Sequence, residues 1–557
     1  MKRQSSSKGF AVLSVASVIS KVLAFIYLPI QAMLVHDNGN GVISAGFKLY
    51  ILIYALTNAG LPTIISKFIS SRLELGDYIG ARMIFRNAFS ITLVFSVISA
   101  LFTFFGAELL AAWCGMPEAK LMFMCIAPTF LVSSVSCSLH GYFQGRHSMT
   151  PTAISQIVEQ IFNSGLTALL EVLFFHYAVS MNQDTVAYTA AGSAVATVLA
   201  VVASTTCLVI IFLVDRRRHR ESEETLQTYD GPPLKSPDVY RQILKYTLPA
   251  IVTTVASGAI DLIDTRSCIP MLMSGGYDSL QAYSLFGIYS TKYQRLLTLP
   301  VLFATPLITA MIPSLSAAVS RQDYDSVVHK IREGFRLNFI VVLPLTAALS
   351  VLAQPVITVI FMSENSGALL VSMGIWTALL TTVQTIQTGV LISLNQPRIP
   401  PITMLVGMVA KLACNYLLIP IPFINIYGAL IGNVLDWVIS IALNQYFIQK
   451  SLGREFRIWN YLVKPGIAAA VMGLMSFCFY FVLNAALGWL SLGTIIANDI
   501  AMLVTIPFGG VVYYIITVRT GVIMRRDIQK LPMSGLILRI SSKIPLVVFQ
   551  DDAEMGK

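Results

Sequence analysis

Three cationic side chains lie deep inside long apolar segments of this chain: Lys21, Lys292 and Arg295. A charged side chain at the centre of a membrane-spanning helix costs about 3 kcal/mol on insertion scales, so it usually faces a cavity or a partner. Lys292 and Arg295 are three residues apart and share one helix face, where like charges repel unless an anion or water separates them. These residues predict an interior that holds an anion. The alternative is that this helix starts later and both cations lie at a membrane interface.

A stripe of polar residues runs along the predicted helix 152–177 and includes Gln156, Glu159 and Asn163. We expect the amides to hold helices together, because amide side chains commonly hydrogen-bond between helices in membranes. Glu159 needs a cation or a proton, and Lys21 is its natural partner. If they pair, Lys21 only fixes helix packing; otherwise it lines a cavity and meets the anion. Whether Glu159 also senses a coupling ion is left open.

Two further candidates carry charge in neighbouring segments. Lys48 lies near the outer start of its helix, where it either extends to the membrane surface or binds the anion. Asp261 is predicted to lie deeper than Asp264 and Arg266, and it is a candidate for proton or cation coupling. A local acid–base pair is the simpler interpretation of Arg266.

The sequence offers no catalytic set. It contains no P-loop and no G-x-S-x-G motif, and its six histidines and seven cysteines show no metal-ligand spacing. We therefore expect no enzyme, no metal and no cofactor, and any transport would draw on the membrane potential or on a proton or sodium gradient. An enzyme acting on polyprenyl lipids would need clustered acidic ligands or a nucleophile dyad. A non-transporting scaffold is a further alternative, but buried like charges would only destabilise such a protein.

The elements that position these residues are predicted to be membrane helices. Of the 557 residues 55% are hydrophobic and 12% are charged, whereas a soluble domain carries about 25% charged residues. Allowing about 20 residues for each span predicts an all-α protein with about 14 transmembrane helices. The expected spans are 9–34, 44–66, 86–112, 119–142, 152–177, 186–213, 241–272, 282–316, 336–361, 367–393, 400–419, 426–448, 463–486 and 494–517.

Charge and composition divide the chain further. The net charge of +10 comes from basic residues in short loops on one side, which places both termini in the cytoplasm and argues against nucleic acid as a partner. The expected parts are an N-terminal lobe 1–215, a cytosolic linker 216–240, a C-terminal lobe 241–450, two extra helices in 451–518 and a basic cytosolic tail 519–557. We expect a multi-pass protein of the bacterial cytoplasmic membrane.

A weak internal repeat supports two halves with one orientation. The same four residue types recur at identical spacing in the equivalent loop of each half. They are Asp77, Tyr78, Arg86 and Phe89 in the first half, and Asp323, Tyr324, Arg332 and Phe335 in the second. Halves with an even number of helices would be related by an axis along the membrane normal.

Several short motifs stand out along the chain: Gly60-Leu61-Pro62 with Ser66-Lys67, Gly141-Tyr142-Phe143-Gln144-Gly145 leading to Met149-x-Pro151-Thr152, Ser155-Gln156-x-x-Glu159-Gln160, Gly287-Ile288-Tyr289, Leu297-x-Leu299-Pro300 and Pro313-x-Leu315-Ser316. Together they resemble the stage V sporulation protein B family, which is similar to the MurJ-type lipid II flippases of the multidrug/oligosaccharidyl-lipid/polysaccharide (MOP) exporter superfamily. Ser20-Lys21-Val22-Leu23 resembles the basic motif of that family's first helix, with Lys21 where MurJ-type proteins often have arginine. The second basic residue of that helix has no match, since Tyr27 stands nearby.

The resemblance implies two helical lobes forming a V, as in MATE-like transporters, and two C-terminal helices that shape a groove for a lipid tail. It also implies a polyprenyl-diphosphate-linked sugar as cargo, contact with membrane lipids, and a flippase that works by alternating access as a monomer. The alternative is a cation-coupled multidrug exporter of the same superfamily, for which an acidic cavity would be needed. Lipid II, a teichoic acid or capsule precursor and a spore-specific lipid are all open as cargo.

Overall fold

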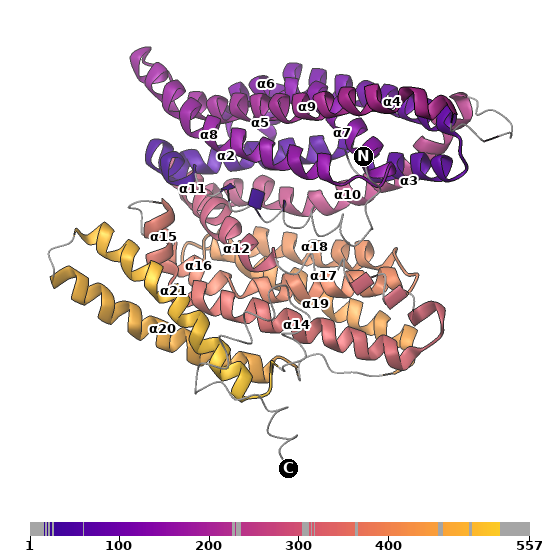
Figure 1. Cartoon of the computed structure of the whole chain (residues 1–557). Coiled ribbons are helices and arrows are strands. Elements are labelled where there is room, and N and C mark those ends of the chain that lie inside the picture. Colours follow the sequence, from indigo (N-terminus) through magenta and orange to yellow (C-terminus); the bar gives the residue numbers. More distant parts are fainter. Residues whose placement is uncertain are drawn as a thin grey trace. The chain divides into compact units, whose positions relative to one another are not determined.

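A computed structural model describes most of the chain, and every regular element in it is helical (Figure 1). The described residues are 16, 19–20, 23–24, 27–58, 61–225, 229, 236–302, 311–312, 315–316, 318–361, 366–454, 461–489 and 493–523. Side chains are described for these residues except 56–58, 218–225, 246, 248–250, 252–257, 259–261 and 494. Two compact units share these residues: unit 1 holds 1–290 and 415–426, and unit 2 holds 291–414 and 427–557. The lobe boundaries drawn from the sequence stay a prediction.

Unit 1 consists of the following helices, with η1 a 3₁₀ turn and η2 a π-helix. They are α2 (Leu28–Asn58), α3 (Leu61–Glu74), α4 (Tyr78–Phe105), α5 (Ala107–Cys114), η1 (Pro117–Ala119), α6 (Lys120–Ile126), α7 (Pro128–Gly145), α8 (Thr150–Ser180), α9 (Thr185–Thr225), α10 (Ser236–Ser274), α11 (Ser279–Gly287) and the start of η2 (Ile288–Tyr293). The chain passes into unit 2 within η2 and returns to unit 1 for the end of α18 and the loop after it.

Unit 2 begins with the last residues of η2. Its helices are α12 (Gln294–Val301), α14 (Tyr324–Val351), α15 (Ala353–Phe361), α16 (Ala368–Gly374), α17 (Thr377–Ser393), α18 (Ile399–Leu418), α19 (Tyr427–Leu452), α20 (Val463–Trp489) and α21 (Thr494–Arg519). Among the described residues, nine helices are long and apolar enough to cross a membrane. The number is ten if Pro117–Ile126 and α7, which meet at a bend of 44°, count together as one span.

Each predicted span from 44–66 onward overlaps described helices, and the all-α fold class is confirmed. The number of about 14 is not fixed by the described residues. Breaks explain part of the difference, because α2 contains a non-helical residue at His36 (φ 52°, ψ −165°) that separates two helical stretches. Short helices such as α11 and α15 are pieces of longer expected spans and are too short to be counted alone, whereas the span of α4 ends at Phe105, before α5.

Close backbone contacts hold the first unit together. A Cβ added at Gly141 of α7 would lie 2.6 Å from the Cβ of Ile65 in α3, and one at Gly145 would lie 2.8 Å from the Cβ of Ile69. These glycines are four residues apart, as in the small-residue pattern that lets membrane helices approach closely.

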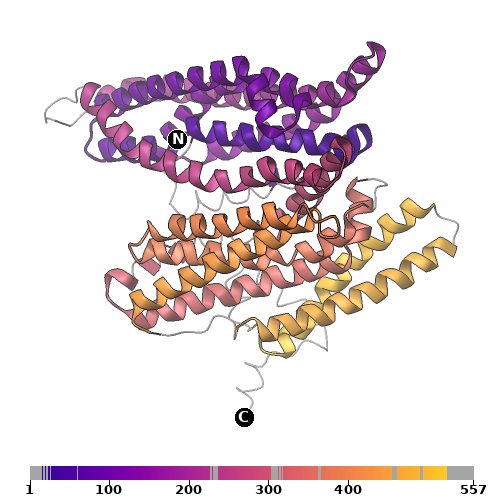
Figure 2. The same cartoon turned by 180° about the vertical axis from the view of Figure 1, so that it is seen from behind.

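In unit 2, α20 and α21 lie side by side in both views (Figures 1 and 2).

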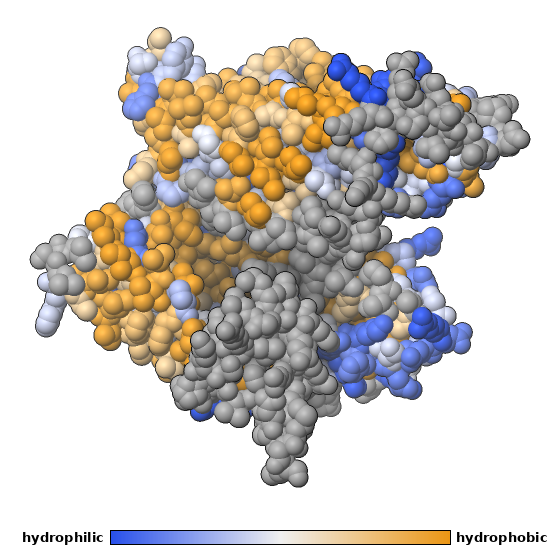
Figure 3. Space-filling model, in the orientation of Figure 1, coloured by the Kyte–Doolittle hydropathy of each residue, from blue (hydrophilic) through white to orange (hydrophobic). Residues whose placement is uncertain are grey.

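The surface is apolar over the middle of the helices. Phe105, Val482 and Leu503 are among many large hydrophobic side chains that are more than two-thirds exposed. Figure 3 shows orange, hydrophobic residues over the long helices of unit 1 and over the pair α20–α21. Because such a surface would aggregate in water, it indicates contact with lipid. The protein is therefore a multi-pass membrane protein.

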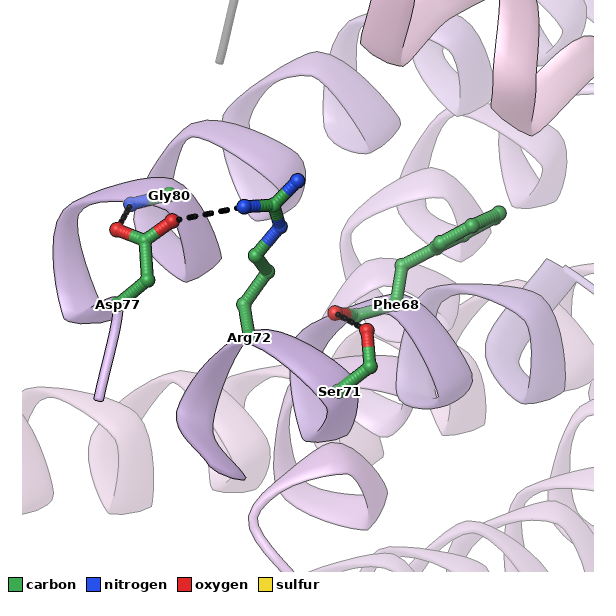
Figure 4. Close-up of polar contacts among 5 residues, drawn as sticks. All are labelled: Phe68, Ser71, Arg72, Asp77 and Gly80. Atoms are coloured by element: carbon green, nitrogen blue, oxygen red, sulfur yellow. Dashed lines mark hydrogen bonds and ion pairs between the residues drawn. The ribbon is translucent and has the colours of Figure 1, made fainter. Parts of the chain in front are cut away.

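The predicted repeat has a structural counterpart at two helix starts. Asp77 caps α4 by accepting a 2.7 Å hydrogen bond from the backbone N–H of Gly80, and Asp323 caps α14 by accepting a 3.0 Å bond from Ser326. The cap residues have nearly the same backbone angles, φ −94° and ψ 78° against φ −85° and ψ 78°. Arg72 also reaches Asp77 at 3.4 Å (Figure 4). The recurring aspartate thus sets the same loop-to-helix turn in each half.

Candidate functional site

Lys292 lies on the π-helix η2 and is almost completely buried, with 1% of its surface exposed. Its Nζ donates hydrogen bonds to the hydroxyl oxygen of Ser366 at 2.6 Å and to the carbonyl oxygen of Ser366 at 3.2 Å. The ammonium also lies 5.7 Å from the centre of the Phe361 ring, within the range of a cation–π contact. A π-helical turn inside a helix is rare and is often found at functional sites. Unit 2 therefore holds a buried cation at an irregular turn.

Arg295 occupies a different environment from Lys292. It lies in the first turn of α12 and is half-buried, whereas Lys292 is enclosed. The shared face was predicted from α-helical spacing, and the π-helix changes that spacing because it adds residues to each turn. The expectation of one common helix face is therefore not supported, although both residues stay candidates for anion contact.

The ammonium group of Lys48 in α2 lies inside unit 1. Its Nζ is buried and lies 5.3 Å from the ring centre of Phe286 and 5.9 Å from that of Tyr289. These rings belong to α11 and η2, so the ammonium of Lys48 connects α2 with both of these elements. Of the two predicted alternatives for Lys48, extension to the membrane surface does not occur in this structure.

Next to Lys48 is a buried polar network that the sequence suggested only in part. The Tyr289 hydroxyl donates to Oδ2 of Asp264 at 2.6 Å, and Nδ2 of Asn415 donates to Oδ1 of Asp264 at 3.0 Å. Asn415 also donates to the Ser267 hydroxyl at 2.8 Å. This network joins α10, η2 and α18, and Asp264 is fully buried while Arg266 is exposed. The Asp261 side chain lies outside the described residues.

The polar stripe of α8 contacts the neighbouring helix α9. Oε2 of Glu159 accepts a 3.1 Å hydrogen bond from Ser204 of α9, and Nδ2 of Asn163 donates to Thr197 of α9 at 3.2 Å. The side-chain Oε1 of Gln156 is buried without a hydrogen-bond partner among the described residues. Asn163 thus joins helices, as we predicted for the amides.

Lys21 lies outside the described residues, but residues on both sides of it are placed. The Ser20 hydroxyl donates to the backbone carbonyl of Gln156 at 3.3 Å, and the Ser164 hydroxyl donates to the carbonyl of Leu23 at 2.8 Å. Both contacts are with α8, so Ser20 and Leu23 lie beside the polar stripe that contains Glu159. The pairing of Lys21 with Glu159 stays a prediction.

One buried polar pair was not predicted from the sequence. Nε2 of Gln31 in α2 donates to Oε1 of Glu171 in α8 at 2.8 Å, and both residues are at most 1% exposed. The available signal was a single carboxyl group inside the apolar run Leu170-Glu171-Val172-Leu173. A carboxyl group in the middle of a spanning helix is expensive and therefore usually functional.

Comparison with known proteins places this architecture in a family. Residues 6–319, more than half of the chain, match the family described as polysaccharide biosynthesis protein. The chain is 23% identical to the lipid II flippase MurJ of Bacillus subtilis over 94% of its own length and 97% of that protein's. It is also 23% identical to stage V sporulation protein B of the same organism, over 97% of this chain and all of the relative. A third Bacillus subtilis relative, the uncharacterized membrane protein YabM, is 25% identical.

Solved structures show the same fold at lower identity. An inward-facing MATE multidrug transporter of the MOP superfamily superposes with a TM-score of 0.60 at 15% identity, covering 80% of this chain and 96% of that one. A MOP superfamily transporter from Pyrococcus furiosus, described as having a binding pocket of reverse polarity, gives a TM-score of 0.54 at 16% identity. The chain therefore belongs to the polysaccharide biosynthesis protein family, is similar to MurJ and stage V sporulation protein B over nearly its whole length, and has the fold of MOP superfamily transporters.

Proposed function

We propose that this protein is a flippase that moves a polyprenyl-diphosphate-linked saccharide across the bacterial cytoplasmic membrane by alternating access. The observation that carries the proposal is the nearly full-length match to a lipid II flippase, which covers 94% of this chain and 97% of the relative. Likeness over the whole length supports a shared transport cycle better than a single shared motif. Both termini would lie in the cytoplasm, and one chain would be sufficient for transport.

The buried cations give the proposal its chemistry. A diphosphate crossing a bilayer needs positive charge in a region of low dielectric, where charge-assisted hydrogen bonds are strongest. Lys292, Lys48, Lys21 and Arg295 are the groups proposed to supply that charge. Lys292 is already desolvated in this structure, so contact with a phosphate would cost it little further hydration. The polyprenyl tail would stay in the lipid while the headgroup passes.

Carboxyl groups within the helices would couple the cycle to an ion. Glu159, Asp261 and Glu171 lie in membrane helices, where a carboxyl group can bind a proton or sodium in one state and release it in another. Energy would come from the membrane potential or from such a gradient. The choice between proton and sodium is part of the proposal to be tested.

Reconstitution of the full chain into vesicles tests this function against multidrug export. Vesicles would carry either a fluorescent polyprenyl-diphosphate saccharide or a cationic dye, under an imposed membrane potential and in protein-free controls. We expect protein-dependent movement of the saccharide headgroup and none of the dye. Movement of the dye alone would favour the multidrug alternative and overturn the proposal.

A further inference from the structure

A cavity lined by arginines lies at the end of unit 1 where the loop between α3 and α4 is found. It has a volume of about 360 Å³ and lies between α4, α7 and α9. Four arginines line it together with aromatic rings: Arg82, Arg86, Arg146 and Arg216. No carboxyl group belongs to this lining in the part of the chain that the structure describes. The proposed transport cycle does not use this cavity.

Two of the four arginines, Arg86 and Arg216, form no ion pair with a carboxylate among the described residues. Arg82 and Arg86 are one turn apart on α4 and therefore share a face. Arg146 lies 3.9 Å from Asp215 and 5.2 Å from the centre of the Tyr142 ring. The side chain of Arg86 is exposed.

The floor of the cavity is a cluster of three aromatic rings from three helices. Phe85 of α4 lies 5.3 Å from Tyr142 of α7 and 5.6 Å from Phe212 of α9, measured between ring centres. Tyr142 and Phe212 are 5.1 Å apart in an edge-to-face arrangement. Contacts of this kind are specific and hold their side chains in place. The cavity therefore combines a fixed apolar floor with a cationic rim.

The cavity lies at the level where apolar helices end. The apolar span of α4 begins at Tyr78, and that of α9 ends at Arg217. Two exposed apolar side chains, Leu213 and Val214, come just before Asp215 and Arg216 in the chain. A ligand here would meet lipid on one side and water on the other, and loop charge places this end at the cytoplasmic surface.

We propose that this cavity binds an acidic diacyl phospholipid of the inner leaflet. The arginines would hold its phosphate, since the planar guanidinium offers two parallel hydrogen bonds to a phosphate group, and the inner leaflet is anionic. One acyl chain would lie on the rings of Phe85 and Phe212. A free phosphate could contact the arginines but has no apolar part to contact the aromatic rings. A lipid can contact both, so it fits the whole cavity.

Binding can be measured on the full chain in detergent. Native mass spectrometry would titrate the protein with dioleoyl-phosphatidylglycerol, with dioleoyl-phosphatidylcholine of the same acyl chains, and with inorganic phosphate. The variants are Arg86→Gln and Arg216→Gln. Arg217→Gln is the matched control, because Arg217 is also exposed and adjacent in sequence but does not line the cavity. Each variant's thermal unfolding without lipid shows whether it is folded.

We expect phosphatidylglycerol to bind in preference to phosphatidylcholine. Each cavity variant should weaken this binding about fivefold, and the double variant about 25-fold, since a surface arginine contributes about 1 kcal/mol to attraction by anionic lipid. Arg217→Gln should leave the affinity unchanged. Equal binding of the two lipids, an equal loss in Arg217→Gln, or full displacement of the lipid by inorganic phosphate would each overturn the proposal. Lipid-linked saccharide transport is measured separately and does not enter these outcomes.

Discussion

Replacement of Gly287 by alanine probes the packing that holds the Lys48 environment. Gly287 ends α11, and a Cβ added there would lie 1.8 Å from the carbonyl oxygen of Asp37 and 2.9 Å from the backbone nitrogen of Gly41. Both contacts are with backbone atoms of α2, so no side chain can rotate to make room. The methyl group comes roughly 1.5 Å closer to this oxygen than an ordinary contact allows, so the helices must separate.

This separation should lower the free energy of unfolding. Extra methyl groups in a packed interior destabilise a protein by about 1–3 kcal/mol, and a contact with unyielding backbone belongs at about 3 kcal/mol, the upper end of that range. Gly41 shows the same closeness from the other side, because its added Cβ would lie 2.5 Å from the carbonyl oxygen of Tyr283. Moving α11 away from α2 would also draw Phe286 away from Lys48.

Gly165→Ala in α8 is the matched control. An added Cβ at Gly165 meets no atom within 4 Å, so this variant should be neutral or more stable by up to about 1 kcal/mol through helix propensity. A thiol-reactive dye reports unfolding, because Cys114, Cys137 and Cys268 are buried and react only when the protein opens. We expect a clearly lower midpoint of thermal unfolding for Gly287→Ala than for Gly165→Ala. Equal midpoints would refute the reasoning about the α2–α11 contact.

Three further changes have defined outcomes. Tyr289→Phe removes the donor to Asp264 and should cost about 1–2 kcal/mol in unfolding free energy; a variant as stable as the wild type would show that the bond is not needed for stability. Asp77→Ala removes the cap of α4 and should cost about 1 kcal/mol, read from the same dye assay with Asp77→Asn as a milder control. Lys120 donates a hydrogen bond to Glu108 and lowers the pKa of that exposed carboxyl group. The small stabilisation from this pair is present near neutral pH and lost as pH falls through the lowered pKa of Glu108. The wild type should therefore be more stable than Lys120→Gln near neutral pH and equally stable in acid. A stability difference that persists in acid would contradict the assignment.

Much of the fold follows from apolar length alone. Segments such as 463–486 and 494–517 were predicted within a few residues of α20 and α21, because long uninterrupted apolar runs leave little freedom in where a spanning helix ends. Asp77 and Asp323 were predicted as a repeat from spacing, and the structure gives that repeat a physical role as a pair of helix caps.

The candidate site was less accessible to sequence reasoning. A π-helical turn at Lys292 has no simple composition signal, and it changes the face on which Arg295 was expected. The contact between Gln31 and Glu171 joins residues 140 positions apart, so only the packing of α2 against α8 reveals it. Sequence identified the charged residues themselves, whereas their partners depend on tertiary contacts that no local pattern specifies.

The most direct measurement of the central claim is the rate of saccharide headgroup transfer in vesicles for Lys292→Gln, compared with Lys292→Arg and Lys464→Gln. Lys464 is an exposed lysine of α20 in the same unit, so its variant controls for the loss of any positive charge. If a buried cation holds the diphosphate, Lys292→Gln should slow transfer by roughly tenfold or more while leaving membrane insertion intact, and Lys464→Gln should not. Lys292→Arg should keep part of the rate because the charge remains. Undiminished transfer by a correctly inserted Lys292→Gln protein would contradict the account.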